Sequence, residues 1–178
     1  EAINSAARYI ETGDAEVVVA GGAENMTRLP YYLRKARSGY RLGHDTIEDG
    51  VVKLLSDPFE DYHMGITAEN LAEKFEISRA AQDEFSAESQ RRALSAIEKG
   101  YFKDQIVPLT VRKGREEQIF DTDEFPQNSS VEKLSKLRPA FKKDGMVTPG
   151  NASGINDGAS ATVVMSASKA ESLGVKAR

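Results

Sequence analysis

Apolar residues near the start of the chain recur with the period of a helix. Ile3, Ala6, Ala7 and Ile10 stand at positions i, i+3, i+4 and i+7, and polar residues occupy the opposite face. This spacing predicts an amphipathic helix, and Gly13 is expected to end it. Because no capping residue stands at the start of this pattern, we expect the natural helix to begin upstream of residue 1.

Two runs rich in β-branched residues, one near each end of the chain, predict strands. Residues 16–20 contain three consecutive valines and stop at a pair of glycines. Such a run is typical of a strand buried on both faces, as in a parallel sheet covered by helices. Residues 161–165 form a matching strand, followed by a helical pattern at 168–173. The two ends are therefore expected to belong to one sheet domain.

The sequence between about residues 26 and 145 has a different character. Residues 28–50 are rich in Tyr, Arg and Gly without a sustained helical or strand period, which predicts an extended excursion. A short helix is expected to open at Thr67. A longer helix is expected to start at the capping residue Ser78 and to continue to residues 98–99.

The later part of this stretch mixes strand and helix signals. Residues 106–111 and 117–120 predict two strands joined across a turn at 113–115. Ser129 and Glu132 have the spacing of a capping box, which predicts a short helix. The chain is therefore expected to be α/β, with a mixed α/β insertion on an incomplete sheet domain.

Composition narrows the class of protein further. Of the 178 residues, 39% are hydrophobic and 29% are charged, which suits one respectable folded core or two small ones. The formal net charge of -4 argues against general binding to nucleic acid or anionic membrane, since both require clustered positive charge. Apolar runs stay far below the ~20 residues that span a bilayer. The chain has no cysteine, so a disulfide framework is excluded and we expect a cytoplasmic protein.

Two histidines, His44 and His63, are the first candidates for chemistry. They have no cysteine partners and no H-E-x-x-H spacing, so we expect no metal. Met64 and Gly65 place a thioether and a bare backbone beside the imidazole of His63. This segment could line a narrow apolar pocket that fits an acyl group, or Met64 could fill the core; the residues alone favour neither interpretation.

A glycine-rich segment is the second candidate. Its glycines stand at 150, 154 and 158, with polar residues between them, including Ser153. The spacing would let a helix face pack closely against a backbone or a ligand, so a structural helix start and a ligand site remain equally open. No P-loop is present, because no Gly-Lys-Ser/Thr follows.

A cluster of basic residues is the third candidate in an otherwise acidic chain. It could attract the phosphates of a nucleotide-bearing cofactor, although most charge runs are solvated faces. The cluster consists of Lys133, Lys136, Arg138, Lys142 and Lys143.

Four segments, in order along the chain, carry a resemblance to a known family. They are 13–26 (GDAEVVVAGGAENM), 62–70 (YHMGITAEN), 137–141 (LRPAF) and 148–159 (TPGNASGINDGA). All four resemble segments of thiolases, enzymes that make and break carbon–carbon bonds between acyl groups carried on coenzyme A. The similarity runs over the whole chain, and several spaced matches in the correct order are more specific than any single motif.

The resemblance implies part of a layered α/β/α thiolase-fold domain that carries a mixed α/β loop-domain insertion. On this basis residues 1–27 are expected to belong to the N-terminal domain. Residues 28–145 are expected to form the loop domain, with a tetramerisation loop at about 28–50. Residues 146–178 are expected to return to the N-terminal domain.

In thiolases one cysteine thiolate attacks an acyl-CoA thioester, and a second cysteine removes an α-proton from acetyl-CoA. The resemblance places the first cysteine a few residues before Glu1. It places the family's oxyanion asparagine, the histidine of its Gly-His-Pro segment and its second cysteine beyond Arg178. We therefore expect an internal piece of a thiolase that lacks both catalytic cysteines and the catalytic histidine, and we assign no catalytic residue.

The resemblance does imply substrate-binding residues. His63 and Met64 resemble the thiolase pair near the thioester and the acyl group, and Ser153 resembles the serine that contacts the pantetheine arm. Three further residues fall where the family lines the cofactor channel, namely Leu55, Leu137 and Pro149.

Two details refine the comparison with the family. The triplet at 62–64 resembles biosynthetic, acetoacetyl-CoA-forming thiolases more than degradative enzymes for long acyl chains. At 125–127 many relatives carry an arginine near the cofactor phosphates, whereas this chain has Pro126 or Gln127.

The parent enzyme implied by the resemblance is an acetyl-CoA acetyltransferase. It would condense two acetyl-CoA molecules to acetoacetyl-CoA and CoA, or catalyse the reverse, in fatty acid metabolism. Coenzyme A would be the substrate carrier, no metal would be needed, and the parent would be a homotetramer that binds neither nucleic acid nor membrane. The alternative is a stand-alone, non-catalytic acyl-CoA-binding or scaffolding module derived from the thiolase fold.

Overall fold

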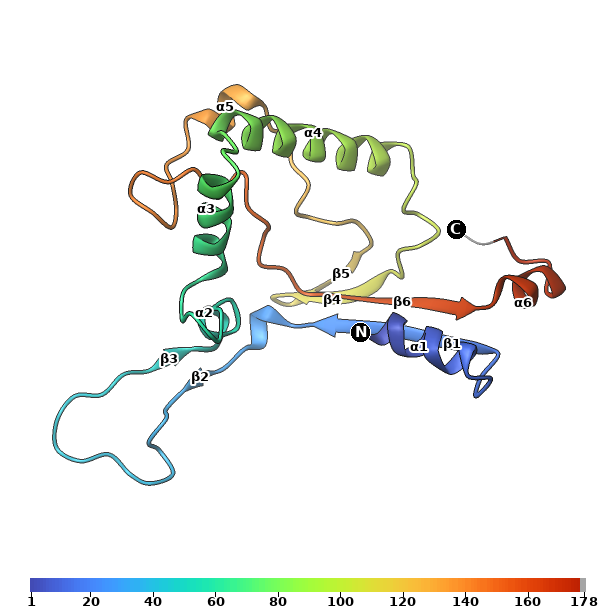
Figure 1. Cartoon of the computed structure of the whole chain (residues 1–178), viewed down its shortest axis with the longest axis horizontal. Coiled ribbons are helices and arrows are strands. Elements are labelled where there is room, and N and C mark those ends of the chain that lie inside the picture. The colour runs from blue at the N-terminus through green and yellow to red at the C-terminus, as the bar shows by residue number, and fades with distance from the viewer. Residues whose placement is uncertain (177–178) are drawn as a thin grey trace. The chain divides into compact units, whose positions relative to one another are not determined.

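The computed structural model describes residues 1–176, which fall into two compact units. The first unit combines Glu1–Lys53 with the chain from Ile155 onward, and the second is Leu54–Gly154. The chain thus leaves the first unit once and returns to it (Figure 1). The family's domain limits at 27/28 and 145/146, which the resemblance implies, stay a prediction.

The core of the first unit combines a two-stranded sheet with the first helix of the chain (Figure 1). Strand β1 (Val17–Glu24) pairs antiparallel with β6 (Gly158–Met165), in a register that runs from Val17 opposite Met165 to Glu24 opposite Gly158. Helix α1 (Ala2–Glu11) packs along this pair. Ala6 of the helix and Ala20 of the strand are buried there, so the small core of this unit lies between helix and sheet.

The structure corrects two expectations about these strands. The β1–β6 pair is antiparallel, and the glycine pair lies inside β1 instead of ending it. Val19 and Val163 are 71% and 60% exposed, so β1 is not buried on both faces. Gly21 explains the continuation, because a Cβ at this position would lie 2.5 Å from the carbonyl oxygen of Ser160 on the partner strand. Glycine therefore permits the close approach of the two strands.

Helix α6 (Ala167–Ser172) follows β6, as the helical pattern predicts. The side chain of Ser166 accepts a hydrogen bond from the backbone N–H of Lys169 and so caps the helix. Lys169 also forms an ion pair of 2.9 Å with Glu16 beside β1. This pair ties the end of the chain to the start of the sheet.

Residues 28–50 form the expected excursion, here called the arm (Figure 1). A short 3-10 helix, η1 (Met26–Arg28), leads into it. The arm is closed at its base by a two-residue antiparallel ladder between β2 (Tyr31–Tyr32) and β3 (Glu48–Asp49). An ion pair of 2.6 Å between Lys35 and Asp45 further stabilises the loop between them.

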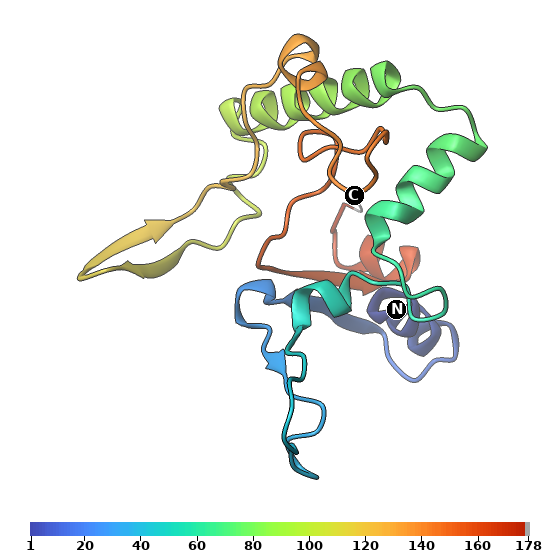
Figure 2. The ribbon, with the colours of Figure 1, turned by 90° about the vertical axis from the view of Figure 1, so that its left-hand side faces the viewer.

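The second unit is built mainly from helices. Helix α2 (Gly50–Leu54) leads into it, followed by α3 (Met64–Lys74), α4 (Arg79–Glu98) and α5 (Val131–Ser135), which packs against α4. Strands β4 (Leu109–Lys113) and β5 (Glu116–Phe120) form an antiparallel hairpin. Figure 2 shows this hairpin projecting away from α4 and α5.

The capping signals in the sequence predicted the start of α4 correctly but misplaced the caps of α3 and α5. Ser78 caps α4 as expected, since its side chain accepts from the N–H of Ala81. Helix α3 begins at Met64, three residues before the expected opening at Thr67, because His63 provides the cap. Helix α5 is capped by Ser130 and not by Ser129.

The structure also answers the question about the glycine-rich segment, for which a helix start was one of two interpretations. Residues 150–157 contain no helix, and Gly158 is the first residue of β6. The structure therefore excludes a helix start there. Across residues 1–176 no helix is both long and apolar enough to cross a membrane.

Candidate functional site

All six residues predicted to bind substrate lie in the second unit, Leu54–Gly154. They come from two stretches of the chain. The first stretch, residues 55–64, is a tight loop that ends at the start of α3, and the second, residues 134–153, runs from α5 to the end of the glycine-rich segment. The first stretch carries Leu55, His63 and Met64, and the second carries Leu137, Pro149 and Ser153.

The first stretch folds back on itself. The backbone N–H of Met64 donates to the carbonyl of Leu55 at 2.7 Å, and Ser56 forms an antiparallel bridge with His63. At the turn, the carboxylate of Asp57 accepts from the backbone N–H groups of residues 59 and 60, both at 2.9 Å. Such an Asx-type turn fixes the loop. The hydrogen bond and the bridge at its base hold Leu55 beside His63 and Met64.

The imidazole of His63 is held on two sides. Its Nδ1 accepts a hydrogen bond of 3.0 Å from the backbone N–H of Gly65, which caps α3. Its ring stacks on the ring of Phe141, with centroids 4.8 Å apart and an interplanar angle of 23°. An accepting Nδ1 carries no hydrogen, so the neutral imidazole has its proton on Nε2, where it can act as a donor.

Gly65 is required for this arrangement. A Cβ on Gly65 would collide with the ring of Phe141, the same ring on which His63 stacks. Met64, the first residue of α3, has 57% of its surface exposed. Met64 is therefore not buried in a core among the described residues, which contradicts its interpretation as core filler.

The second stretch is held by a buried turn. Thr148 is fully buried, and its Oγ1 accepts from the N–H of Gly150 at 3.2 Å. The N–H of Thr148 donates to Oδ1 of Asn151 at 2.7 Å. A Cβ on Gly150 would lie 2.5 Å from side-chain carbons of both Leu134 and Leu137. Gly150 therefore lets the turn pack directly against the end of α5.

The predicted residues on this stretch are accessible. Leu137 is 39% exposed, and Pro149 and Ser153 are also exposed. Thr148 is buried, and so is Leu134, which lies against Gly150. These two buried residues support the exposed surface that Leu137, Pro149 and Ser153 form.

Two buried carboxylates, which the sequence analysis did not single out, anchor the second stretch on the helices. Glu69 of α3 is 2% exposed. Its Oε1 accepts from the N–H of Met146 at 3.0 Å and of Val147 at 2.8 Å, and its Oε2 accepts from Met146 at 2.8 Å. The backbone immediately before Thr148 is therefore bound to α3.

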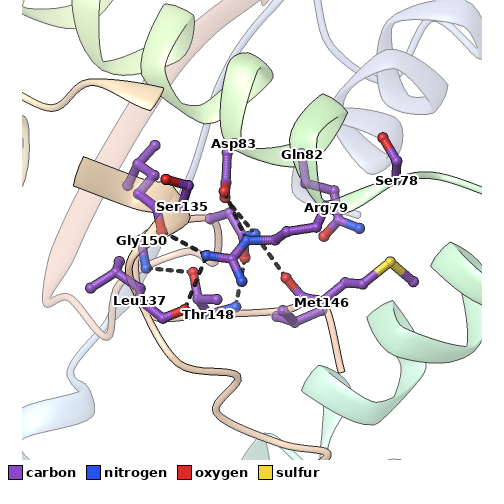
Figure 3. Close-up of polar contacts among 12 residues, drawn as sticks. Ser78, Arg79, Gln82, Asp83, Ser135, Leu137, Met146, Thr148 and Gly150 are labelled. Atoms are coloured by element: carbon purple, nitrogen blue, oxygen red, sulfur yellow. Dashed lines mark hydrogen bonds and ion pairs between the residues drawn. The ribbon is translucent and has the colours of Figure 1, made fainter. Parts of the chain in front are cut away.

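Asp83 of α4 is 1% exposed and joins a larger set of contacts (Figure 3). It accepts from Nε of Arg79 at 2.8 Å and from Nδ2 of Asn151 at 3.1 Å. One terminal nitrogen of Arg79 donates to the carbonyl oxygens of Leu134 and Leu137, at 2.6 and 3.1 Å. Both oxygens of the buried carboxylate thus accept a hydrogen bond, as a buried charged group requires.

A sequence signal for one of these carboxylates was present. Glu69 lies at i+4 from Gly65 and i−3 from Ala72, both of which are buried. A charged residue on a helix face of small residues indicates a specific buried partner, because an isolated buried charge is costly. Asp83 gave a weaker signal, its i+4 spacing from Arg79.

The basic cluster is divided by its contacts. Lys136 pairs with Glu132 at 2.7 Å, and Lys142 pairs with Glu73 at 3.2 Å. These two lysines belong to exposed ion pairs, which contribute little to stability. The other three residues of the cluster, Lys133, Arg138 and Lys143, are exposed.

The surface of the first unit has cavities among its described residues. One of about 310 Å³ is in the arm and is lined by residues that include Lys35 and Tyr40. Another of about 510 Å³ lies between the end of α1 and α6, and its lining includes Ile10 and Ser172. Neither cavity is lined by any of the six predicted substrate-binding residues.

The fold places the chain in a known class of protein, the proteins with the thiolase fold. The structure of an acetyl-CoA acetyltransferase from Bacillus anthracis matches with a TM-score of 0.89 and 51% identity, over 98% of this chain and 45% of that chain. A human mitochondrial 3-ketoacyl-CoA thiolase, solved in complex with CoA, matches with a TM-score of 0.86 and 40% identity, over 98% of this chain and 44% of that one. The predicted α/β fold class is thereby confirmed.

Sequence comparison gives the family. The profile described as "Thiolase, N-terminal domain" matches residues 1–168. The acetyl-CoA acetyltransferase of Pseudomonas aeruginosa is 53% identical over 178 residues, covering 98% of this chain and 45% of that protein. The enzyme of the same name from Syntrophomonas wolfei is 50% identical, with the same coverage. The chain belongs to the thiolase family, as the resemblance implied, and it spans about 45% of the length of these relatives.

Proposed function

We propose that this chain contributes a wall of the acyl-CoA binding site of an acetyl-CoA C-acetyltransferase. The parent enzyme condenses two acetyl-CoA molecules to acetoacetyl-CoA and CoA, or catalyses the reverse. Relatives about half identical to the chain carry the name acetyl-CoA acetyltransferase, and a structural neighbour was solved with CoA. The observation that carries the proposal is the fixed His63 beside the exposed Met64.

In this proposal each of the six residues has a role that suits its chemistry. The Nε2–H of His63 donates toward the thioester, and the thioether of Met64 contacts the acyl group. The hydroxyl of Ser153 bonds to an amide of the pantetheine arm. The remaining three residues, Leu55, Leu137 and Pro149, offer apolar surface to the arm.

The covalent steps require groups that these 178 residues do not contain, since the chain has no cysteine. A thiolate attacks the carbonyl carbon of acyl-CoA, the bond from that carbon to the sulfur of CoA breaks, and CoA leaves as its thiolate. A second cysteine takes the α-proton of acetyl-CoA, and the resulting carbanion forms a bond to the carbonyl carbon of the acyl-cysteine. The bond from that carbon to the cysteine sulfur then breaks, so the first cysteine leaves as its thiolate and acetoacetyl-CoA is released. We assign both cysteines and the catalytic histidine to parts of the parent enzyme outside this chain.

The wider context belongs to the same proposal. The parent is a cytoplasmic homotetramer of fatty acid metabolism, and the arm (28–50) is its tetramerisation loop. Residues 1–27 and 146–178 belong to its N-terminal domain, and residues 28–145 form its loop domain. The separate arm ladder and its ion pair support a role distinct from the acyl-CoA wall.

Thiolysis of acetoacetyl-CoA tests this proposal. The purified chain, free of host thiolase, is expected to give no turnover, and the protein encoded by the whole surrounding reading frame is expected to be active. Turnover by the chain alone would contradict the assignment of the thiolates to other segments. An inactive product of the whole frame, or natural start and stop codons at the borders of this chain, would instead favour the stand-alone binding or scaffolding module.

A further inference from the structure

We propose that Asp83 is a positioning residue, which sets the spacing between the two parts of the second stretch that form the acyl-CoA wall. These parts are residues 134–137, which carry Leu137, and residues 146–153, which carry Pro149 and Ser153. The inference rests on the proposed function for its meaning. Its geometry is independent of that function.

The two oxygens of the Asp83 carboxylate serve different parts of the wall (Figure 3). Oδ2 accepts from Nε of Arg79 at 2.8 Å, and Oδ1 accepts from Nδ2 of Asn151 at 3.1 Å. The carboxylate is 1% exposed. In such a water-poor site both hydrogen bonds are charge-assisted and strong.

Arg79 transmits this position to residues 134–137. The guanidinium group is planar and its donors have fixed directions. With Nε bound to Asp83, one terminal nitrogen points to the carbonyl oxygens of Leu134 and Leu137. Leu134 is the next-to-last residue of α5, and Leu137 lies two residues beyond the end of the helix. Asp83 therefore fixes the backbone of Leu137 through the planar guanidinium group of Arg79.

Asn151 transmits the same position to the glycine-rich segment. Its Nδ2 donates to Asp83 and also to the carbonyl of Met146 at 3.0 Å, and its Oδ1 accepts from the N–H of Thr148 at 2.7 Å. One side chain therefore closes the turn that contains Pro149. Ser153 follows this turn two residues later.

Only a carboxylate satisfies both partners. Both groups that face Asp83 are donors, and an asparagine at this position would offer one accepting oxygen and one donating NH₂ group. Asp83→Asn must therefore lose the contact with either Arg79 or Asn151. Gly150, in the part 146–153, packs directly against Leu134 and Leu137. A shift of one part relative to the other therefore changes the wall.

The test compares Asp83→Asn with Glu84→Gln, a matched control because Glu84 is the next residue of α4 and is exposed. Each ¹⁵N-labelled chain is titrated with CoA, and its amide spectrum and binding isotherm are recorded. Asp83→Asn is expected to shift the amide signals of 134–137 or 146–153, and to weaken CoA binding about tenfold, the factor equivalent to losing one hydrogen bond. The amide signals of the β1–β6 sheet, which belongs to the other unit, and the Glu84→Gln control serve as checks that the fold is kept.

Arg79→Lys is the second variant, because it keeps the positive charge but loses the fixed fork. It is expected to move the signals of 134–137 more than those of 146–153, which a general loss of stability would not do. Unchanged signals in both parts and CoA affinity within about twofold of the control would overturn the inference. If the unsubstituted chain binds no CoA, the proposed function fails for this chain, and the signal shifts alone still decide the positioning role.

Discussion

Replacing Glu69 with glutamine removes one negative charge from the interior of the second unit and keeps the shape of the side chain. In the structure this carboxylate accepts three hydrogen-bond contacts of 2.8 to 3.0 Å from the N–H groups of Met146 and Val147. The amide of glutamine has one accepting oxygen, and its NH₂ group would face the N–H of Met146. The substitution thus weakens the hydrogen bonds by which Glu69 of α3 holds the backbone of residues 146 and 147.

The size of the effect follows from these contacts. Hydrogen bonds to charged groups contribute about 1 kcal/mol more than neutral ones, and two N–H donors are affected. Relief of the buried charge acts in the opposite sense, so we expect Glu69→Gln to lower the free energy of unfolding by about 1–2 kcal/mol. Glu69→Ala leaves both N–H groups without an acceptor and opens a cavity, so we expect about 3 kcal/mol.

Urea unfolding followed by circular dichroism measures both values. Glu73→Gln is the control, because Glu73 lies on the same helix, is 72% exposed and pairs with Lys142 from the same stretch. Its expected effect is below about 0.5 kcal/mol. Amide hydrogen exchange at residues 146 and 147 reports the local part of the change. If Glu69→Gln and Glu73→Gln unfold at the same urea concentration, and the two amides remain protected, the buried carboxylate does not anchor this stretch.

Three further predictions concern packing, capping and charge. Gly150→Ala is expected to lower the free energy of unfolding by about 1–3 kcal/mol, because its methyl group overlaps two leucine side chains. Gly22→Ala is the control, since its methyl group enters open space. Equal stabilities of the two variants in urea unfolding would contradict the packing. His63→Ala should lose about 1 kcal/mol of capping and about 1 kcal/mol of ring stacking, whereas His63→Asn should recover the capping share. Equal Tm values for these two His63 variants would exclude the cap. The pKa of Glu88 is lowered from 4.5 to about 2, chiefly by its hydrogen bond from Arg91. The contact therefore stabilises the fold above pH 4.5, and this stabilisation is lost as the pH falls toward about 2. An NMR titration of the Glu88 carboxyl with a midpoint near 4.5 would show that the ion pair does not form.

Local signals accounted for much of the fold. Helix α4 starts after Ser78 and ends at Glu98 as expected, and the helical period predicted α1. These elements depend on groups within a few residues of each other, which a sequence displays directly. The cap of α3 was missed because histidine is an uncommon capping residue, although His63 places Nδ1 within reach of the N–H of Gly65.

The orientation of the long-range strand pair could not be obtained in the same way. A valine run suits a buried parallel strand or an antiparallel one, and the partner of β1 lies near the other end of the chain. The site shows the same limit. The ring stacking of His63 and the contacts of Glu69 and Asp83 depend on residues 134–151, which are distant in sequence. The resemblance to thiolases supplied the six candidate residues, and the buried groups that hold them became visible only in three dimensions.

Mapping of CoA on the ¹⁵N- and methyl-labelled chain tests the central claim most directly. The account predicts weak binding, with signal changes concentrated at the two stretches 55–64 and 134–153 and with methyl changes at Met64 and Leu137. The thioester of added acetyl-CoA should stay intact, because the chain has no cysteine. Changes confined to the arm or to the β1–β6 sheet, or no change at millimolar CoA, would contradict the assignment of an acyl-CoA wall to this chain.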